Sequence, residues 1–296
     1  MFRTLLVVAF LALGCSDAST GSEPGPGSTL DGAIPERPSP GVNQYTLMQQ
    51  VDGVEVARTF QLHVPPTYDG NGSLPLLFAY HGADGVGLDF VGQFEATVSR
   101  GEFVGVYPDG IANSWNVERE DSNADDIAFT TDILSFLDGI PGLDTARPVA
   151  VGFSNGAALL HKIAIESNVF AAIVPQASQL LVDNPPRAGG GRVSVMQFMG
   201  TADGLCPYGG GMGILGYNYM PAEASAAAWA AHNGCDATAS ERRVGEHLRM
   251  EWEGCAAGYR VIHYRLNGVG HGVPPNVDGG TEARIVEFLS EARGGS

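Results

Sequence analysis

A glycine-serine motif near the middle of the 296-residue chain carries the residue types of a covalent catalyst. Gly152-Phe153-Ser154-Asn155-Gly156 has the pattern G-x-S-x-G and stands between a strand-like run at 148–152 and a helical pattern at 156–167. On such a turn the serine Oγ is exposed, the glycines avoid a clash, and the next N–H points at a developing oxyanion. We therefore expect Ser154 to be a nucleophile and the Asn155 N–H to be an oxyanion donor, with a structural glycine turn as the alternative.

An acid and a histidine that follow later strands are needed to activate such a serine. Asp203 comes shortly after a predicted strand at 193–199, whereas Asp183, the rival acid, lies further beyond the strand that precedes it. Of seven histidines, His271 alone follows the last predicted strand, in a loop of small residues. We expect His271 to be the general base toward Ser154, and Asp203 to hold its tautomer and stabilise the imidazolium.

A second oxyanion donor is expected where the first parallel strand, predicted at 74–81, ends. The segment His81-Gly82-Ala83-Asp84-Gly85 closes that strand, and the fold type places an oxyanion N–H there. The Ala83 N–H is our candidate, which makes His81 a scaffold residue. Ligation of a metal by His81 and Asp84 is the alternative.

The remaining five histidines are predicted to have no part in the chemistry. His63 and His263 sit within predicted strands and are expected to be structural. His161, His232 and His247 lie on helical or polar stretches, so we expect them at the surface.

Short apolar runs alternate with helical patterns along the body of the chain. Runs without strict polar alternation suit strands that are covered on both faces of a mainly parallel sheet. Strand followed by helix, repeated, predicts a doubly wound α/β fold with helices on both faces, in which ligands bind beyond the carboxyl ends of the strands. The predicted strands are 43–50, 54–64, 74–81, 103–108, 148–152, 171–175, 193–199 and 259–266, and the predicted helices are 124–137, 156–167, 221–232 and 281–292.

The charge balance excludes a class of partners. The chain has 33 Asp and Glu against 16 Lys and Arg, a formal net charge of −17. Nucleic acids and anionic membrane surfaces are bound through clustered cations, and the sequence has no run of them. We expect neither partner, and no cofactor is indicated by the motifs.

The first fifteen residues read as an export signal. Arg3 precedes an uninterrupted apolar run at 5–13, which is too short to span a bilayer. Cys15, directly after Ala12-Leu13-Gly14, resembles the box at which bacterial lipoproteins are cleaved and acylated. We expect residues 1–15 to be a signal peptide with Cys15 lipidated at the cell envelope; a signal peptide cut further on is the alternative.

A change in composition separates this signal from the rest of the chain. In residues 16–41, 15 of 26 are Ser, Gly or Pro, too little apolar matter to offset chain entropy. This segment is predicted to be a flexible tether, and residues 42–296 a single catalytic domain.

Cysteine usage agrees with export. Beyond Cys15, three thiols remain, which allow one disulfide in three possible pairings. Cys235 and Cys255 bracket a short charged loop that an oxidising compartment favours closing. Cys206 would then be a free thiol that alkylates readily. A zinc site is the weaker alternative because no Cys-x-x-Cys pair exists.

Together these segments resemble the secreted serine esterases of the poly(3-hydroxybutyrate) depolymerase and feruloyl esterase type, within the α/β-hydrolase superfamily. The resemblance implies the α/β-hydrolase fold, ester hydrolysis, the triad Ser154, Asp203 and His271, and a Cys235–Cys255 bridge. Its motifs are Val64-Pro65, Tyr80-His81-Gly82, Tyr107-Pro108-Asp109-Gly110, Ser114-Trp115-Asn116, Asp126-Ile127-Ala128-Phe129, the Ser154 motif, Gly200-Thr201-Ala202-Asp203 with Pro207-Tyr208, Trp229 with Asn233-Gly234-Cys235, and Gly268-Val269-Gly270-His271.

Two departures from that family bear on the substrate. Ala157 stands where the family has a second glycine, and Val273 where it has tryptophan two residues after the histidine. Loops carrying Trp115 and Tyr208 are expected to bind substrate in an open, partly apolar site. We expect short-chain or soluble oligomeric esters; a serine peptidase of prolyl-oligopeptidase type and a catalytically silent surface-binding protein are the alternatives.

Overall fold

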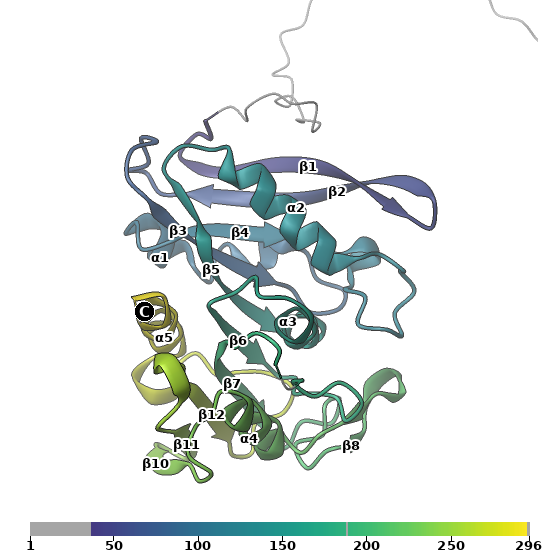
Figure 1. Ribbon diagram of the computed structural model, residues 1–296, viewed down its shortest axis with the longest axis vertical. Coiled ribbons are helices and arrows are strands. Elements are labelled where there is room, and N and C mark those ends of the chain that lie inside the picture. The colour runs from purple at the N-terminus through teal and green to yellow at the C-terminus, as the bar shows by residue number, and fades with distance from the viewer. Residues whose placement is uncertain (1–36, 188, 295–296) are drawn as a thin grey trace, which may run out of the picture.

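A ten-stranded sheet runs through the computed structural model, which describes residues 37–187 and 189–294. The strands from β4 to β12 in sheet order are parallel, whereas β1, β2, β11 and β10 continue the two ends antiparallel (Figure 1). This mainly parallel sheet confirms the predicted fold class. In sheet order the strands are β1 Gly41–Val51, β2 Val54–Val64, β4 Val104–Pro108, β3 Leu74–Tyr80, β5 Leu143–Phe153, β6 Ala172–Gln176, β7 Ser194–Gly200, β12 Val261–Leu266, β11 His247–Trp252 and β10 Ser240–Val244.

Helices cover both faces of the sheet. Side chains of α2, α3 and α4 pack into the core on one face, and those of α5, with Phe94 directly before α1, into the core on the other. The helices are α1 Glu95–Ser99, α2 Asp126–Asp138, α3 Asn155–Glu166, α4 Ala222–His232 and α5 Thr281–Gly294. Short elements are the strands β8 Gly211–Met212 and β9 Asn218–Tyr219 and the 3₁₀ turns η1 Gly87–Phe90, η2 Ile111–Asn113, η3 Ile214–Gly216, η4 Ala256–Gly258 and η5 Val277–Gly279.

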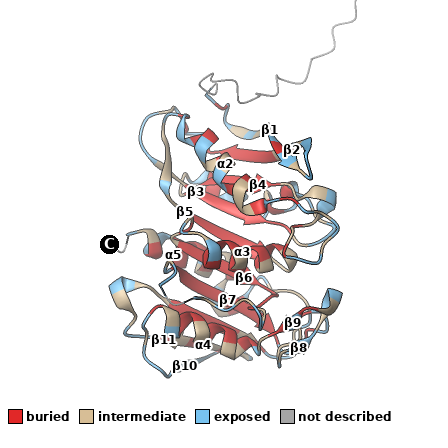
Figure 2. Ribbon diagram, turned by 45° about the vertical axis from the view of Figure 1, so that its right-hand side comes forward, coloured by how far each residue is buried: buried red, intermediate tan, exposed pale blue. Residues whose placement is uncertain are grey.

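The central strands are buried along their whole length, which explains why they read as continuous apolar runs. Every residue of β4, β6 and β7 is buried, as expected when helices cover both faces of a parallel sheet. Figure 2 shows this core as a band of buried ribbon through the middle of the molecule. The buried strands fix the positions of the loops at their carboxyl ends.

The predicted leader falls where the structure gives no description. The signal peptide at 1–15, Cys15 and most of the tether at 16–41 lie outside the described residues. Strand β1, the first element that the structure describes, begins at Gly41.

The segment between Cys235 and Cys255, expected to be a charged loop, contains the hairpin β10–β11. That expectation is wrong because the strands lie at the sheet edge, where charged side chains are tolerated on the exposed face. In β11 half-buried and buried residues alternate, while four of the five residues of β10 are exposed. The charges masked the period-two pattern that marks a strand.

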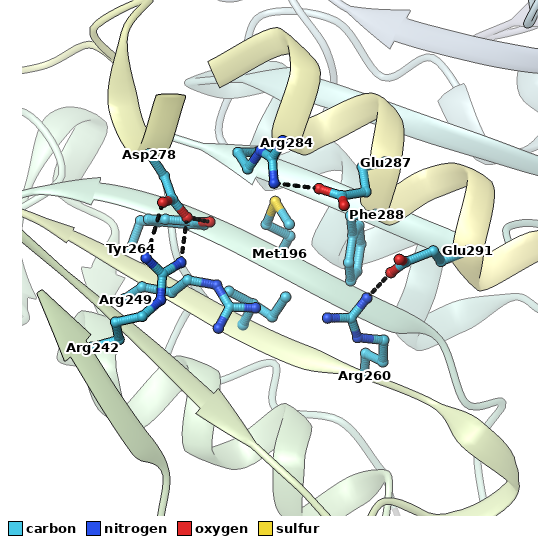
Figure 3. A pocket seen from close by; sticks show the side chains of 11 residues that line it. Met196, Arg242, Arg249, Arg260, Tyr264, Asp278, Arg284, Glu287, Phe288 and Glu291 are labelled. Carbon is cyan, nitrogen blue, oxygen red and sulfur yellow. Dashed lines mark hydrogen bonds and ion pairs between the residues drawn. The ribbon is translucent and has the colours of Figure 1, made fainter. Parts of the chain in front are cut away.

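Arginine–carboxylate pairs fasten this end of the sheet to η5 and α5. These side chains line a pocket of about 200 Å³. Each ion pair drawn in Figure 3 joins a guanidinium to a carboxylate. Arg242 binds Asp278 at 2.8 Å, and Tyr264 Oη donates to the same carboxylate at 2.9 Å. Arg260 pairs with Glu291 on α5. Because these guanidinium groups are paired with carboxylates, we assign the ion pairs around the pocket a structural role.

A disulfide closes the segment that holds the hairpin. Cys235 and Cys255, 20 residues apart in sequence, are joined. Of the three pairings that the sequence leaves open, this is the one that the family resemblance implies. Closing a loop of this length lowers the entropy of the unfolded chain, a stabilisation of about 3 kcal/mol in the chain-entropy model.

His161 is buried, and its expected surface position is wrong. Helix α3 is buried along most of its length because it packs on the sheet and against α4. His161 is 3% exposed, and its Nδ1 accepts a hydrogen bond from Trp229 Nε1 at 3.1 Å. Burial lowers the pKa of His161 to about 4, so the ring is neutral in the folded protein.

Acidification should therefore destabilise the fold through His161. The unfolded chain binds a proton at this histidine near pH 6.5, whereas the folded chain does so only near pH 4. Stability falls as pH drops through this window, by up to about 3 kcal/mol from this one group. Urea unfolding at pH 7 and pH 4.5 measures the loss. His161→Gln, which keeps an acceptor for Trp229, is expected to shrink it, and an equal loss in that variant would contradict the assignment.

Candidate active site

Ser154 occupies a strained turn between β5 and α3. Its φ is 53° and its ψ is −115°, a backbone conformation that non-glycine residues adopt only where the surroundings enforce it. Its N–H donates to the Gln176 carbonyl at 2.8 Å. A Cβ at Gly152 would lie 2.5 Å from the Gly156 carbonyl oxygen, and a Cβ at Gly156 would lie 2.3 Å from that of Tyr80. Both glycines are therefore required by the close packing of β3, β5 and α3.

The structure brings Ser154, His271 and Asp203 into one hydrogen-bonded row. His271 Nε2 lies 2.7 Å from Ser154 Oγ, and His271 Nδ1 lies 2.8 Å from Asp203 Oδ2. Asp203 follows β7 and His271 follows β12, and these strands are parallel neighbours. The loops are also joined by the Ala202 N–H, which donates to the Val269 carbonyl at 2.9 Å. Strand adjacency thus places residues 68 positions apart in contact.

The carboxylate of Asp203 is buried and stays ionised. Its Oδ1 accepts the N–H groups of Leu205 and Cys206, each at 2.9 Å. Burial by itself raises the pKa of Asp203, but the hydrogen bonds from His271 and the two backbone groups outweigh it, so the pKa lies below its usual value. Asp203 can therefore accept from the His271 Nδ1–H and fix its tautomer. Asp183, the rival acid, is exposed.

The two residues expected to supply oxyanion donors lie beside Ser154. Asn155 is the first residue of α3, and N–H groups in the first turn of a helix have no intrahelical partner. Ala83 and Asn155 line the same pocket as Ser154. A Cβ at Gly82 would meet the Ser154 Cβ at 3.4 Å, so the loop after β3 passes directly beside the serine.

The side chain of Asn155 is held by a network that the sequence did not reveal. Its Oδ1 accepts the Trp115 N–H at 2.7 Å, and its Nδ2 donates to the Trp115 carbonyl at 3.0 Å and to Glu120 Oε1 at 3.1 Å. Glu120 Oε2 in turn accepts from Tyr217 Oη at 2.9 Å. No local pattern marks Glu120, because its side-chain partners Asn155 and Tyr217 lie far from it in the sequence. The network fixes the residue that begins α3.

The two residues expected to bind substrate have other contacts. Trp115 is fully buried, and its Nε1 donates to the His81 carbonyl at 2.8 Å. Tyr208 Oη donates to Glu223 at 2.8 Å and lies 3.0 Å from His263 Nε2. Neither residue lines the pocket at Ser154, so the expected role of Trp115 and Tyr208 is corrected. The contacts of these two side chains instead hold the loops that carry them.

The pocket beside Ser154 is small and mostly apolar. Its volume is about 60 Å³. The segment around β8 and β9 supplies part of its wall. The lining residues are Ala83, Ser114, Glu120, Ser154, Asn155, Ala158, Cys206, Ile214, Leu215, Tyr217 and Tyr219.

Cys206 differs from the expected reactive thiol. It is 2% exposed, and burial raises the pKa of its thiol to about 11. Because the thiolate is the reactive form, we now expect slow alkylation in the folded protein. Cys206 acts as an apolar wall residue whose backbone N–H holds Asp203.

His81 makes the contacts of a scaffold residue. Its Nε2 accepts the Gly110 N–H at 3.0 Å, and its Nδ1 donates to the Gly82 carbonyl at 2.7 Å. Burial lowers the pKa of His81, which favours the neutral ring. Among residues 37–187 and 189–294, no three His, Cys, Asp or Glu side chains gather where they could hold a metal ion.

The chain is similar to known esterases. No protein-family model matches the chain. Feruloyl esterase B of Piromyces equi is 28% identical over 222 residues, which cover 70% of this chain and 41% of that protein. The chain therefore spans less than half the length of this relative.

Two solved structures of esterases share the fold of this chain. An acetyl xylan esterase from Aspergillus awamori superposes with a TM-score of 0.59 at 15% identity, over 85% of this chain and 99% of that one. The LpqC poly(3-hydroxybutyrate) depolymerase from Bordetella parapertussis gives a TM-score of 0.53 at 14% identity, over 78% and 85% of the two chains.

The sheet order, the serine turn and these likenesses define the chain as a protein of α/β-hydrolase fold. Among proteins of that fold it is similar to esterases, namely those called feruloyl esterase, acetyl xylan esterase and poly(3-hydroxybutyrate) depolymerase. The resemblance expected from the motifs is confirmed.

Gly156→Ala tests the packing at the serine turn. In an ordinary helix this change stabilises by about 1 kcal/mol, but here the new Cβ would meet the Tyr80 and His81 carbonyl oxygens at 2.3 and 2.5 Å. We expect a net loss of about 1–3 kcal/mol with loss of ester hydrolysis. Thermal unfolding measures this, with Gly209→Ala, whose Cβ meets nothing within 4 Å, as the neutral control. A Gly156→Ala protein more stable than the wild type would contradict the packing argument.

Proposed function

We propose that the chain is a serine carboxylic-ester hydrolase that works through Ser154, His271 and Asp203. The observation that carries the proposal is the row from Ser154 Oγ through His271 to Asp203, with spacings of 2.7 and 2.8 Å. This spacing is within the hydrogen-bond reach that nucleophile activation requires. The nearby N–H groups of Ala83 and Asn155 supply the matching oxyanion donors.

Acylation follows from this geometry. Ser154 Oγ attacks the ester carbonyl carbon while His271 Nε2 accepts its proton, and Asp203 stabilises the imidazolium. The carbonyl oxygen becomes an oxyanion that accepts from the Ala83 and Asn155 N–H groups. The bond from carbon to the alcohol oxygen then breaks, and His271 gives its proton to the departing alcohol.

Deacylation repeats the sequence with water. His271 takes a proton from a water molecule that attacks the acyl carbon, and the same two N–H groups stabilise the second oxyanion. The bond to Ser154 Oγ breaks, and His271 returns the proton to that oxygen. The products are a carboxylic acid and the free enzyme.

Short acyl groups fit this site best. The pocket at Ser154 holds about 60 Å³, the volume of about two water molecules. Acetyl and propionyl groups suit such a space, and a long chain does not. We therefore propose short-chain esters and soluble oligomers as substrates, with weak action on intact polymer films.

Two other functions remain to be separated from this one. A serine peptidase would use the same triad, and a silent binding protein would leave it unused. Labelling by a fluorophosphonate distinguishes a reactive serine from a silent one. Parallel assays on p-nitrophenyl esters and peptide anilides then distinguish esterase from peptidase, and faster anilide cleavage would favour the peptidase.

We further propose that the protein is exported and anchored through Cys15. The cationic start, the apolar run and Cys15 support this, and all lie outside the described residues. The Cys235–Cys255 disulfide fits an oxidising compartment. Among the residues that the structure describes, none of the helices has the length and apolar character to cross a membrane.

Substitution of the triad should abolish ester hydrolysis without unfolding the chain. We expect Ser154→Ala and His271→Ala to lower kcat by about 10⁶-fold and Asp203→Asn by about 10⁴-fold. Steady-state kinetics on p-nitrophenyl acetate measure the loss, and circular dichroism checks the fold. Asp183→Asn is the matched control, and a strong effect there with a harmless Asp203→Asn would reassign the acid.

The mature N-terminus tests the anchor. Mass spectrometry of the protein from its native host is expected to find residues 1–14 removed and Cys15 acylated, in the membrane fraction. A soluble mature form that begins well after Cys15 would reject the anchor and leave export standing.

A further inference from the structure

The loop before α2 wraps around the carboxylate of its own Glu120. The Oε2 atom of Glu120 accepts the N–H groups of Val117, Glu118 and Arg119 at 2.8, 3.1 and 3.2 Å, and Tyr217 Oη donates to it at 2.9 Å. Successive N–H groups that converge on one oxygen form a nest for a negative charge. Glu118, in the middle of this nest, has a φ of 147°, which non-glycine residues rarely adopt. Strained backbone of this kind gathers at functional sites.

The other carboxylate oxygen of Glu120 faces the serine site. Its Oε1 accepts from Asn155 Nδ2 at 3.1 Å, and Asn155 directly follows Ser154. Among the described residues that line the 60 Å³ pocket, Glu120 is the one charged side chain. A negative charge near a developing oxyanion repels it. This carboxylate therefore does not stabilise the oxyanion directly, and its place in the pocket wall calls for another role.

The contacts of Asn155 indicate that role. Its Oδ1 accepts from the Trp115 N–H at 2.7 Å and from Ser114 Oγ at 3.2 Å. Its Nδ2 donates to the Trp115 carbonyl and to Glu120, so the amide makes the four hydrogen bonds that its atoms allow. Glu120 completes this set. A carboxylate suits the position because one oxygen must accept from the nest while the other accepts from Asn155.

We infer that Glu120 is a positioning residue for ester hydrolysis, which acts through Asn155. Held by four hydrogen bonds, Asn155 fixes the first turn of α3 and with it the backbone N–H that is proposed to donate to the oxyanion. Such a donor is effective only when it points at the place that the oxyanion occupies, and a displacement of about 1 Å can lower a rate about 100-fold. The inference rests on the proposed function and adds to it a residue outside the triad.

Glu120→Gln tests the role of the carboxylate. Glutamine has the size of glutamate, but its NH₂ group cannot accept a hydrogen bond, so it satisfies either the nest or Asn155 and not both. We expect kcat for p-nitrophenyl acetate to fall about 10–100-fold, with KM within about twofold of the wild type because the lost interaction belongs to the transition state. Asp121→Asn, which removes a charge from the next and exposed residue, is the matched control and should keep the wild-type kcat. An unchanged kcat in Glu120→Gln would overturn the inference.

A transition-state analogue separates positioning from a simple loss of folded enzyme. When 1,1,1-trifluoroacetone binds, Ser154 Oγ forms a bond to the carbonyl carbon, its proton passes to His271 Nε2, and the π electron pair stays on the carbonyl oxygen as an oxyanion. Because the adduct resembles the transition state, we expect its inhibition constant in Glu120→Gln to rise by the factor by which kcat/KM falls. An inhibition constant that stays at the wild-type value while activity falls would overturn the inference.

A double-mutant cycle tests whether Glu120 acts through Asn155. Asn155→Ala removes the side-chain amide and keeps the backbone N–H. If the two side chains act as one unit their effects are not additive, so the double variant should have a kcat/KM within about threefold of Asn155→Ala alone. Losses that multiply in full would show that Glu120 acts independently and would overturn the inference. If Glu120→Gln does not fold, Glu120→Asp replaces it, since aspartate keeps both acceptor oxygens and is one CH₂ too short to reach both partners.

The choice of ester distinguishes positioning from a role as pocket wall. The oxyanion forms in the same way on every ester, so we expect Glu120→Gln to leave the kcat/KM ratio of p-nitrophenyl butyrate to p-nitrophenyl acetate within about twofold of the wild type. A changed ratio with an unchanged kcat for the acetate would assign Glu120 to acyl selection and overturn the inference, while ester hydrolysis itself stands. If the wild type hydrolyses neither ester, the proposed function fails, and the inference fails with it.

Discussion

The close approach of three backbone segments around Ser154 is the constraint on which the site depends. Strand β3, the end of β5 and the first turn of α3 meet at distances that admit no Cβ at Gly152 or Gly156. This contact turns the serine out of the sheet with a φ of 53°. It also sets Ala83 and Asn155 beside the serine, so the same packing positions the proposed nucleophile and the proposed oxyanion donors.

The sequence predicts the triad well because each member follows a buried parallel strand. Apolar runs locate such strands, and parallel neighbours necessarily bring their carboxyl ends together. Ser154 could therefore be chosen from its G-x-S-x-G motif after a strand, and Asp203 and His271 from order and strand position; the structure brings the three into contact. The scaffold contacts of His81 follow from the same reasoning.

Side-chain direction is what the sequence could not supply. Trp115 turns into the core and Tyr208 toward Glu223, because long-range packing decides where a loop side chain points. The sequence predicts His161 at the surface, whereas α3 is buried along most of its length. A polar residue in the sequence does not reveal that its helix is buried on several sides. Glu120 bonds to Asn155 at the start of α3 and to Tyr217, both distant in the sequence, so no local pattern predicts its place at the site.

The charged strand β10 has a consequence for the behaviour of the protein in solution. As the last strand of the sheet it leaves one edge of backbone N–H and C=O groups that no other strand of the described part of the chain covers, and such edges recruit strands of other molecules. Glu241, Arg242 and Arg243 are all exposed there. Another chain could pair with this edge only by desolvating those charges. The charged edge strand therefore protects the protein against aggregation.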